Sequence, residues 1–355
     1  MDQKPVVSDT MGKEIKIAIG SDALLWHEKF AAVLSDLCNR GYSIDYKVVN
    51  LEGYDWLQVV TPYDMIIWKP TYMGPRLTTQ FHAKVYFLET YCKKLVVPNF
   101  KTIWHFENKI AQNYLFQIYK IPTPRTTISF DYYDAIKQLQ SETFPLVFKE
   151  PHGAGSQNVK LVLNFKQAEN IVINKFSQQL WMEHKVRSSS RIIFLLSNLT
   201  KRWLWNKILQ KVFKSEYSTF IYWQSFIPNN EADLRITVIG NRYAFGFWRK
   251  NRPNDFRASG SGRIDYQQIV PEDILRYCVN INRELDFDSM AYDILFSKNS
   301  FVIAEISYGY LDSAIYNAPG YYEFRENGEL VFIKGHFWPQ ELWVKWALER
   351  AAKKL

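Results

Sequence analysis

Residues 145–163 read PLVFKEPHGAGSQNVKLVL. The two apolar runs at 145–150 and 158–163 are typical of buried strands, and a glycine-rich loop joins them. Lys149 closes the first run, and the small residues Gly153, Gly155 and Ser156 let backbone N–H groups approach a ligand closely. A lysine beside such a loop indicates a polyphosphate site, although Gly-x-Gly is also common in plain hairpin loops.

Two carboxylates farther along the chain each stand alone in an apolar strand run. Asp293 lies in SMAYDILF (289–296) and Glu305 in FVIAEIS (301–307). A buried carboxylate needs a cation or a proton, and two of them on adjacent strands suit magnesium. The side chains of Asp293 and Glu305 point to the same face of the sheet if residues 298–300 form a loop with an odd number of residues. The alternative is that each acid forms a structural ion pair with a nearby Arg or Lys.

Arginines cluster near an expected hairpin whose turn is marked by Gly240-Asn241. They are Arg235, Arg249, Arg252, Arg257 and Arg263, with Asp233 beside them. Guanidinium groups match the geometry of carboxylates and phosphates. The flexible run FRASGSG (256–262) can bend around a substrate. The alternative is a solvated charged face.

The first hundred residues alternate strand and helix signals. Strands are expected at 14–19, 42–49, 65–68 and 94–97, with helices at 22–39, capped by Ser21 and ended by Gly41, and at 78–91. This alternation predicts a parallel sheet with covering helices. Further helices are expected at 104–119, 165–174, 271–285 and 340–352.

The composition of the 355 residues is that of a globular protein with many aromatic rings, and its net charge of +8 favours anionic partners. Three cysteines without a CxxC pair and six histidines without metal spacing argue against a disulfide scaffold or a zinc site. A signal-peptide core and a stretch long enough to span a bilayer are both absent, which predicts a cytoplasmic protein.

Residues 176–216 interleave basic and large apolar residues, so they form either a packing helix or a contact with the inner membrane face or a glycan.

The order of these features resembles the ATP-grasp superfamily over about residues 95–310. The matching motifs are Asn108-Lys109, IPTP at 121–124, PLVFK at 145–149 with its loop, QSFI at 224–227, DLR at 233–235, and Asp293 with Glu305 and Ser307. Asn108 and Ser307 depart from the family, which has Asp and Asn there, and Ser225 stands where Glu is frequent. The run from WQSFIPNN to AEISYGY, and the tail through GHFWPQELW, is also similar to ATP-grasp proteins of bacterial surface-polysaccharide gene clusters.

The resemblance implies an α/β (α+β) ATP-grasp fold behind an N-terminal parallel-sheet domain. Its domains are expected at 1–98, at 99–225 with the insert 176–216, and at 226–355. ATP would bind through Lys109, Lys149, Gly153, Gly155, Ser156, Gln224, Phe226, Ile227 and Asp233. Magnesium would bind through Asp293, Glu305 and Ser307, and the catalytic residues would be Arg235, Arg249 and Arg257.

The implied activity is an ATP- and magnesium-dependent carboxylate–amine ligase that forms an amide through an acylphosphate. Its substrates would be a small or glycan-linked carboxylate and an amine acceptor, in the synthesis of a capsule or O-antigen. Two alternatives remain: a phosphotransferase of the same fold acting on a sugar or alcohol, and a non-catalytic nucleotide-binding module. Nucleic acid is not expected as a partner, because the basic residues lack an RNA-binding signature.

Overall fold

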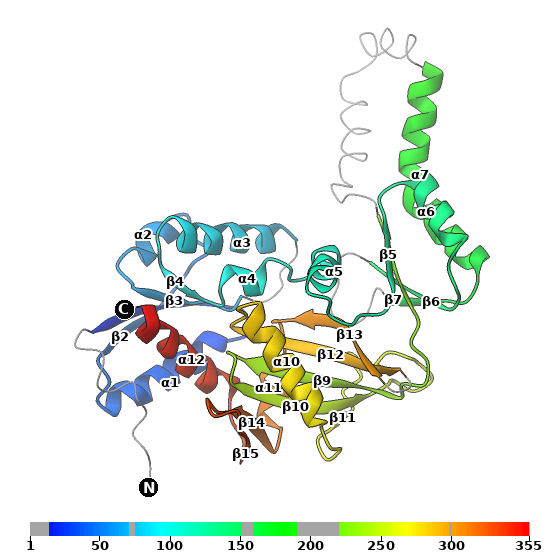
Figure 1. Cartoon of the computed structure of the whole chain (residues 1–355). Helices are drawn as coiled ribbons and strands as arrows, with labels where there is room; N and C mark the ends of the chain where they lie inside the picture. Colours follow the sequence, from blue (N-terminus) through cyan, green and yellow to red (C-terminus); the bar gives the residue numbers. More distant parts are fainter. Residues whose placement is uncertain (1–13, 71–74, 151–158, 190–219, 298–299, 355) are drawn as a thin grey trace. The chain divides into compact units, whose positions relative to one another are not determined.

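The computed structural model describes residues 14–70, 75–150, 159–189, 220–297 and 300–354 (Figure 1). The chain divides into two compact units. Unit 1 comprises Met1–Phe106, Asn230–Phe296 and Ile303–Leu355, and unit 2 comprises Glu107–Asn229 with Ser297–Val302. Unit 1 contains two sheets and unit 2 contains one, and each unit has its own apolar core.

The first segment of unit 1 forms a parallel sheet with the strand order β2-β1-β3-β4. Its elements are β1 (Ile15–Gly20), α1 (Trp26–Asn39), β2 (Ile44–Val49), α2 (Trp56–Val60), β3 (Met65–Ile67), α3 (Pro75–Thr90), β4 (Leu95–Val97) and α4 (Phe100–Ile103). Parallel neighbours need crossover connections, which α1 and α3 supply. The predicted parallel sheet is therefore confirmed.

Helix α1 begins later than the sequence predicts, and Ser21 does not cap it. Asp22 takes this role, because its carboxylate accepts hydrogen bonds from the backbone N–H groups of Trp26 (3.3 Å) and His27 (3.1 Å). A longer acceptor side chain one residue later thus satisfies the open helix end. Gly41 follows the helix at φ +87°, as expected for a helix-ending glycine.

The remaining segments of unit 1 build a seven-stranded sheet with the order β13-β12-β9-β10-β14-β15, and β11 pairs with β10. Its elements are β9 (Ala232–Ile239), β10 (Tyr243–Lys250), β11 (Ile264–Asp265), α10 (Glu272–Glu284), β12 (Ser289–Ser297), β13 (Ser300–Ser307), α11 (Asp312–Tyr316), β14 (Gly320–Phe324), β15 (Leu330–Lys334) and α12 (Pro339–Lys354). Strand β13 starts at Ser300, so the expected loop 298–300 is shorter by that residue. Residues 298 and 299 themselves lie outside the described part of the chain.

The hairpin predicted at Gly240-Asn241 joins β9 to β10. Gly240 has φ +60°, and a Cβ atom there would lie 2.6 Å from the Trp346 ring. Only glycine tolerates both this backbone conformation and this close approach. The turn therefore fixes the register that brings Asp233 opposite Arg249.

One apolar core joins the parts of unit 1 that are distant in sequence. It includes Ile17 and Ile19 of β1, Trp26 and Phe30 of α1, Phe245 and Phe247 of β10, and Trp343 and Ala347 of α12. These side chains are at most 2% exposed. The two sheets of unit 1 are thus held by shared burial of large apolar groups.

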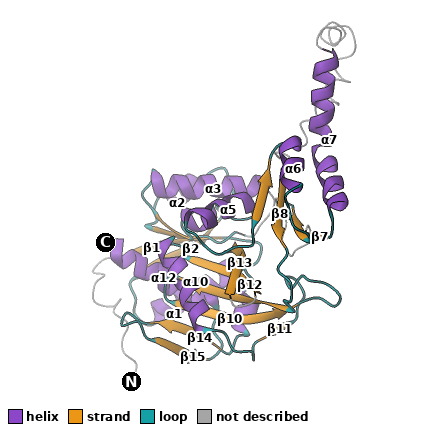
Figure 2. Ribbon diagram, turned by 45° about the vertical axis from the view of Figure 1, so that its right-hand side comes forward, coloured by secondary structure: helices purple, strands orange, loops and turns teal. Residues whose placement is uncertain are grey.

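Unit 2 contains a four-stranded sheet with the order β5-β8-β6-β7. Its elements are α5 (Lys109–Ile118), β5 (Thr126–Ser129), α6 (Tyr132–Leu139), β6 (Leu146–Lys149), β7 (Val159–Val162), α7 (Phe165–Ser189) and β8 (Ile221–Ser225). Helices α6 and α7 lie side by side and cover the sheet through a core that contains Leu139, Phe148, Val172 and Trp223 (Figure 2).

Two helices differ from their predicted extents by five residues or more at one end. The helix expected at 104–119 starts only at Lys109, because Glu107 adopts φ +53° and Asn108 then caps a new helix. Helix α7 passes its predicted end at residue 174 and reaches Ser189, since the sequence between contains no Gly or Pro to end it. In the described part of the chain, no helix has the length and apolar character that crossing a membrane requires. Most of the basic segment 176–216 lies outside the described residues.

Candidate functional site

Four charged side chains meet on one face of the large sheet in unit 1. Asp233 and Arg235 lie two residues apart on β9, so they point to the same side. Asp233 lies opposite Arg249 of β10, and Arg235 lies opposite Asp293 of β12. The strand register alone therefore places two acids and two arginines in one cluster, which we call the β9 ion network.

The β9 ion network is closely bonded. Arg249 Nε lies 2.7 Å from Asp233 Oδ1, and Arg249 Nη2 lies 2.8 Å from Asp293 Oδ2. Arg235 donates two further hydrogen bonds to Asp293, from Nε to Oδ1 at 2.7 Å and from Nη2 to Oδ2 at 2.8 Å. Arg249 thus bridges both carboxylates while its own residue is only 6% exposed.

Burial and nearby charges shift the pKa values of Asp233 and Asp293 in opposite directions. Burial raises the pKa of the Asp233 carboxyl, and the nearby Asp293 charge adds to this effect, so Arg249 does not restore the ordinary value. Burial also opposes ionisation of Asp293, but Arg235 and Arg249 outweigh it and hold the pKa of that carboxyl below its ordinary value. The pKa of Asp233 is thus raised and that of Asp293 is lowered, although the two acids share Arg249.

The sequence left two roles open for Asp293, a magnesium ligand or a structural ion-pair partner, and the β9 ion network bears on this choice. Both carboxylate oxygens of Asp293 lie within 2.8 Å of arginine nitrogens, so in this structure Asp293 forms ion pairs with Arg235 and Arg249. Glu305 and Ser307 lie two residues apart on β13, the strand beside β12. Among the residues that the structure describes, no three His, Cys, Asp or Glu side chains are grouped to hold a metal. One or two carboxylates with substrate phosphates are nevertheless a usual magnesium site.

The third predicted catalytic arginine lies elsewhere in unit 1. Arg257 is in the loop between β10 and β11, where its Nε lies 2.9–3.0 Å from both carboxylate oxygens of Asp255. This hydrogen bonding raises the pKa of Arg257 and lowers the pKa of Asp255. Arg257 is thus held by a loop neighbour, whereas Arg235 and Arg249 belong to the β9 ion network.

The predicted ATP-phosphate lysines belong to unit 2. Lys149 is the last residue of β6, lies opposite Val159 of β7, and is 9% exposed. Lys109 is the first residue of α5 and is also buried. Asn108 accepts a hydrogen bond from the Ala111 N–H at 3.1 Å, so it caps the helix. Gly153, Gly155 and Ser156 lie outside the described residues.

The predicted adenine hinge follows strand β8 of the same unit. The Gln224 side-chain amide donates to Thr126 Oγ1 at 3.1 Å and to the Tyr222 hydroxyl at 3.0 Å. The Phe226 N–H donates to the Pro145 carbonyl at 3.2 Å, which ties the hinge to the start of the Lys149 strand. Ile227 follows directly in the chain.

One buried cation was missed by the sequence analysis. Lys69 lies two residues after β3 and is 4% exposed, with Nζ 3.8 Å from the centre of the Trp26 ring. Burial lowers its pKa from 10.5 to about 8, although Asp22 and Asp312 pull in the opposite direction. The available signal was a single lysine between the apolar run MIIW and Pro70, at the carboxyl end of a predicted parallel strand.

Replacing Lys69 by Met is expected to stabilise unit 1 at pH 7. The pKa shift corresponds to about 3 kcal/mol against the charged form, and attraction to Trp26 offsets part of it, so we expect a gain of about 1–3 kcal/mol. Because the folded-state pKa lies below the unfolded value, the gain is complete below pH 8 and disappears as pH rises from 8 to 10.5. Urea unfolding at pH 7 and at pH 10.5 measures it. A gain of equal size at both pH values would contradict this prediction.

Known proteins resemble this chain in sequence and in fold. No family model matches the chain. It is 22% identical over 302 residues to the α-aminoadipate–LysW ligase LysX of Saccharolobus solfataricus, covering 83% of this chain and 90% of the relative. Among solved structures, D-alanine–D-alanine ligase from Bacillus anthracis, complexed with ATP, matches with a TM-score of 0.55 at 11% identity, covering 97% of this chain and 99% of the other.

A second solved structure, a RimK-domain ATP-grasp protein from Sphaerobacter thermophilus, matches with a TM-score of 0.51 at 14% identity. The match covers 84% of this chain and 93% of that protein. Both likenesses span nearly the whole of the other chain. The fold predicted from the order of the motifs is therefore confirmed: the chain has the ATP-grasp fold.

Proposed function

We propose that the protein is an ATP- and magnesium-dependent carboxylate–amine ligase. The observation that carries the proposal is Asp293, an acid kept ionised on a strand beside Glu305 and Ser307 in a chain with the ATP-grasp fold. These oxygens are the donors that magnesium prefers. The name of the curated relative, which couples α-aminoadipate to LysW, and the D-alanine ligase likeness support amide formation.

The chemistry proceeds in two displacements. An oxygen of the substrate carboxylate attacks the γ-phosphorus of ATP, the bond to the β-phosphate oxygen breaks, and ADP leaves. The amine nitrogen then attacks the acyl carbon, the bond to the phosphate oxygen breaks, the amine loses a proton and inorganic phosphate leaves. Magnesium, when bound, neutralises negative charge on the phosphate oxygens. Neither step requires a covalent bond to the protein, so positioning and charge complementarity suffice.

The residues of this chain divide these tasks. Lys109 and Lys149 hold the ATP phosphates, with Gly153, Gly155 and Ser156 beside them. Phe226 and Ile227 border the adenine. Arg249 and Arg257 stabilise the anionic acylphosphate, and Arg235 keeps Asp293 ionised and oriented through two hydrogen bonds.

The proposal for the substrates has two parts, their chemical class and the biosynthetic process to which they belong. The relative's name favours an amino-acid-type acid or amine. A place in surface-polysaccharide synthesis rests on the sequence resemblance alone, since the three proteins compared above carry no such role in their names. Membrane contact through residues 176–216 stays a prediction on a segment that lies mostly outside the described residues.

An ADP-release screen that pairs amino acids, uronic acids and nucleotide-linked uronic acids tests the reaction class. A ligase releases phosphate only when acid and amine are both present. ADP release with one alcohol substrate, and phosphate retained on the product, would instead identify a phosphotransferase. ATP binding without turnover on any pair would identify a non-catalytic module.

Replacing Lys149 by Met is expected to weaken ATP binding by about 10–100-fold, because a charge-assisted hydrogen bond contributes about 1.5–3 kcal/mol. Calorimetric titration with ATP and magnesium measures this. The matched control is Lys160→Met on the neighbouring strand β7, where the lysine is exposed. Unchanged affinity in Lys149→Met, or an equal loss in the control, would remove Lys149 from the site.

A further inference from the structure

The parallel sheet of unit 1 has a topological switch point between β1 and β3. From β1 the chain crosses through α1 to β2 on one side, and from β3 it crosses through α3 to β4 on the other. In open α/β sheets, ligands bind in the crevice outside the carboxyl ends of such strands. Lys69 lies two residues past β3, and Asp22 lies two residues past β1, so both stand at this crevice.

Two buried donors at this crevice have no acceptor among the residues described. The Lys69 ammonium makes neither a hydrogen bond nor an ion pair with any of them, and contacts only rings: Trp26 at 3.8 Å, Tyr310 at 5.6 Å and Tyr308 at 6.0 Å. The indole N–H of Trp68 is likewise buried without an acceptor in that part of the chain. Buried donors are nearly always satisfied, so these two indicate an acceptor outside the described residues.

The two carboxylates that act on Lys69 through space, Asp22 and Asp312, are engaged elsewhere. Asp22 accepts the backbone N–H groups at the start of α1 and lies 3.2 Å from the ring nitrogen of His27. Asp312 accepts from Lys29 at 2.6 Å and from the Gln340 side chain at 2.9 Å. Both acids act on Lys69 through space but do not bond to it, which leaves the ammonium open to another anion.

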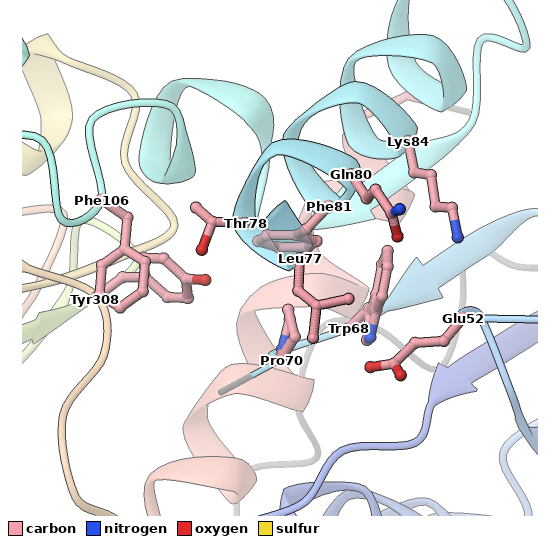
Figure 3. Close-up of a pocket in the computed structure, with 10 residues that line it drawn as sticks. All are labelled: Glu52, Trp68, Pro70, Leu77, Thr78, Gln80, Phe81, Lys84, Phe106 and Tyr308. Carbon is pink, nitrogen blue, oxygen red and sulfur yellow. The ribbon is translucent and has the colours of Figure 1, made fainter. Parts of the chain in front are cut away.

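A pocket with an aromatic wall lies beside Trp68, and the charged residues Glu52 and Lys84 also line it. Trp68, Phe81, Phe106 and Tyr308 supply the rings, and Leu77 and Pro70 complete the apolar part of the lining (Figure 3). Phe106 and Tyr308 pack with ring centres 4.5 Å apart. Tyr308 is both part of this lining and one of the rings around Lys69, and it directly follows the end of β13, the strand of Glu305 and Ser307.

We propose that this crevice binds the non-reacting carboxylate of a small substrate with an apolar body. Lys69 pairs with the carboxylate, the Trp68 indole donates to a second acceptor oxygen, and the apolar body lies against the aromatic wall. The inference rests on the proposed ligase activity, because it names the kind of substrate that the unit carrying Asp293 receives. A carboxylate restores to the buried ammonium the counter-charge and hydrogen bonds that burial removes.

Benzoate and benzamide form a matched pair of probes, since they share a flat apolar body and differ in charge. In ligand-observed NMR titrations of the full chain at pH 7, we expect benzoate to bind at least about tenfold more tightly than benzamide, as one charge-assisted hydrogen bond implies. Lys69→Met should reduce this preference to about one. Lys94→Met, which removes another lysine of the same sheet, should leave it unchanged.

The pH dependence of the wild-type chain gives a second, mutation-free readout. Benzoate keeps its charge above pH 7, whereas Lys69 loses its own near pH 8, so the preference should fall steadily between pH 7 and 9.5. Burial raises the pKa of Tyr310 above its ordinary value, so that tyrosine stays neutral in this window. Hydrogen bonds from Lys29 and Gln340 outweigh burial and hold the pKa of Asp312 below its ordinary value, so this acid stays charged there.

Equal affinity for the two probes, a preference that survives Lys69→Met, or a preference constant to pH 9.5 would each overturn the proposal. Calorimetric ATP titrations on the same samples separate it from the proposed function. ATP binding without a benzoate preference refutes this site alone. A benzoate preference without ATP binding upholds the site and refutes the ligase activity.

Discussion

Replacing Arg249 by Met is expected to lower the free energy of unfolding by about 3–5 kcal/mol, because breaking a buried ion pair leaves its partners uncompensated. Arg249 bridges Asp233 and Asp293, so both carboxylates lose a donor at once. The pKa of Asp233 is already raised by burial, and we expect it to rise further in the variant. Urea unfolding at pH 7 measures the loss.

Lys250→Met is the matched control for Arg249→Met. Lys250 is the next residue of β10, is exposed, and pairs with Asp265 at 3.0 Å. An exposed pair of this kind contributes about 0–1 kcal/mol. Similar losses in the two variants would show that Arg249 acts only as a surface residue of the sheet.

Replacing Asp293 by Asn is expected to lower ATP turnover by at least about 100-fold, because metal-assisted charge stabilisation contributes several kcal/mol to the transition state. The substitution keeps the shape of the side chain and removes its charge. It also leaves Arg235 without its ion-pair partner, so the melting temperature should fall as well. ADP release under saturating magnesium, at a temperature where the variant stays folded, measures the effect.

Two further variants separate the metal role of Asp293 from its structural role. Glu305→Gln should lower turnover too, whereas Asp265→Asn, on the exposed pair with Lys250, should change neither turnover nor magnesium dependence. If Asp293→Asn melts earlier but retains full magnesium-dependent turnover, Asp293 is a structural ion-pair partner only.

The sequence predicted those features that depend on local patterns. Alternating strand and helix signals predicted the parallel sheet, and Gly240-Asn241 predicted the turn that sets the β9–β10 register. The order of the motifs predicted the fold, because these motifs are spread over about two hundred residues and such a succession rarely arises by chance. Helix ends were less accurate, since the cap of α1 depends on whether Asp22 or Ser21 reaches the open N–H groups.

The sequence alone could not predict which charged side chains form ion pairs with one another. Asp293 and Arg249 are 44 positions apart, and only the strand order places β10 and β12 on either side of β9. The choice between ion pair and metal ligand stayed open for this reason. Lys69 was missed because its importance lies in its burial among rings from α1 and from the segment after β13, which no local pattern reveals.

The division of unit 1 among three stretches of chain affects how the molecule assembles. Most of unit 2, Glu107–Asn229, is synthesised before the two later stretches of unit 1 exist. Trp26 and Phe30 of α1 pack against Trp343 of α12, more than three hundred residues later. Contacts of such long sequence separation form slowly and leave apolar surface uncovered in the meantime. The apolar core of unit 1 can therefore be complete only after α12 has been synthesised.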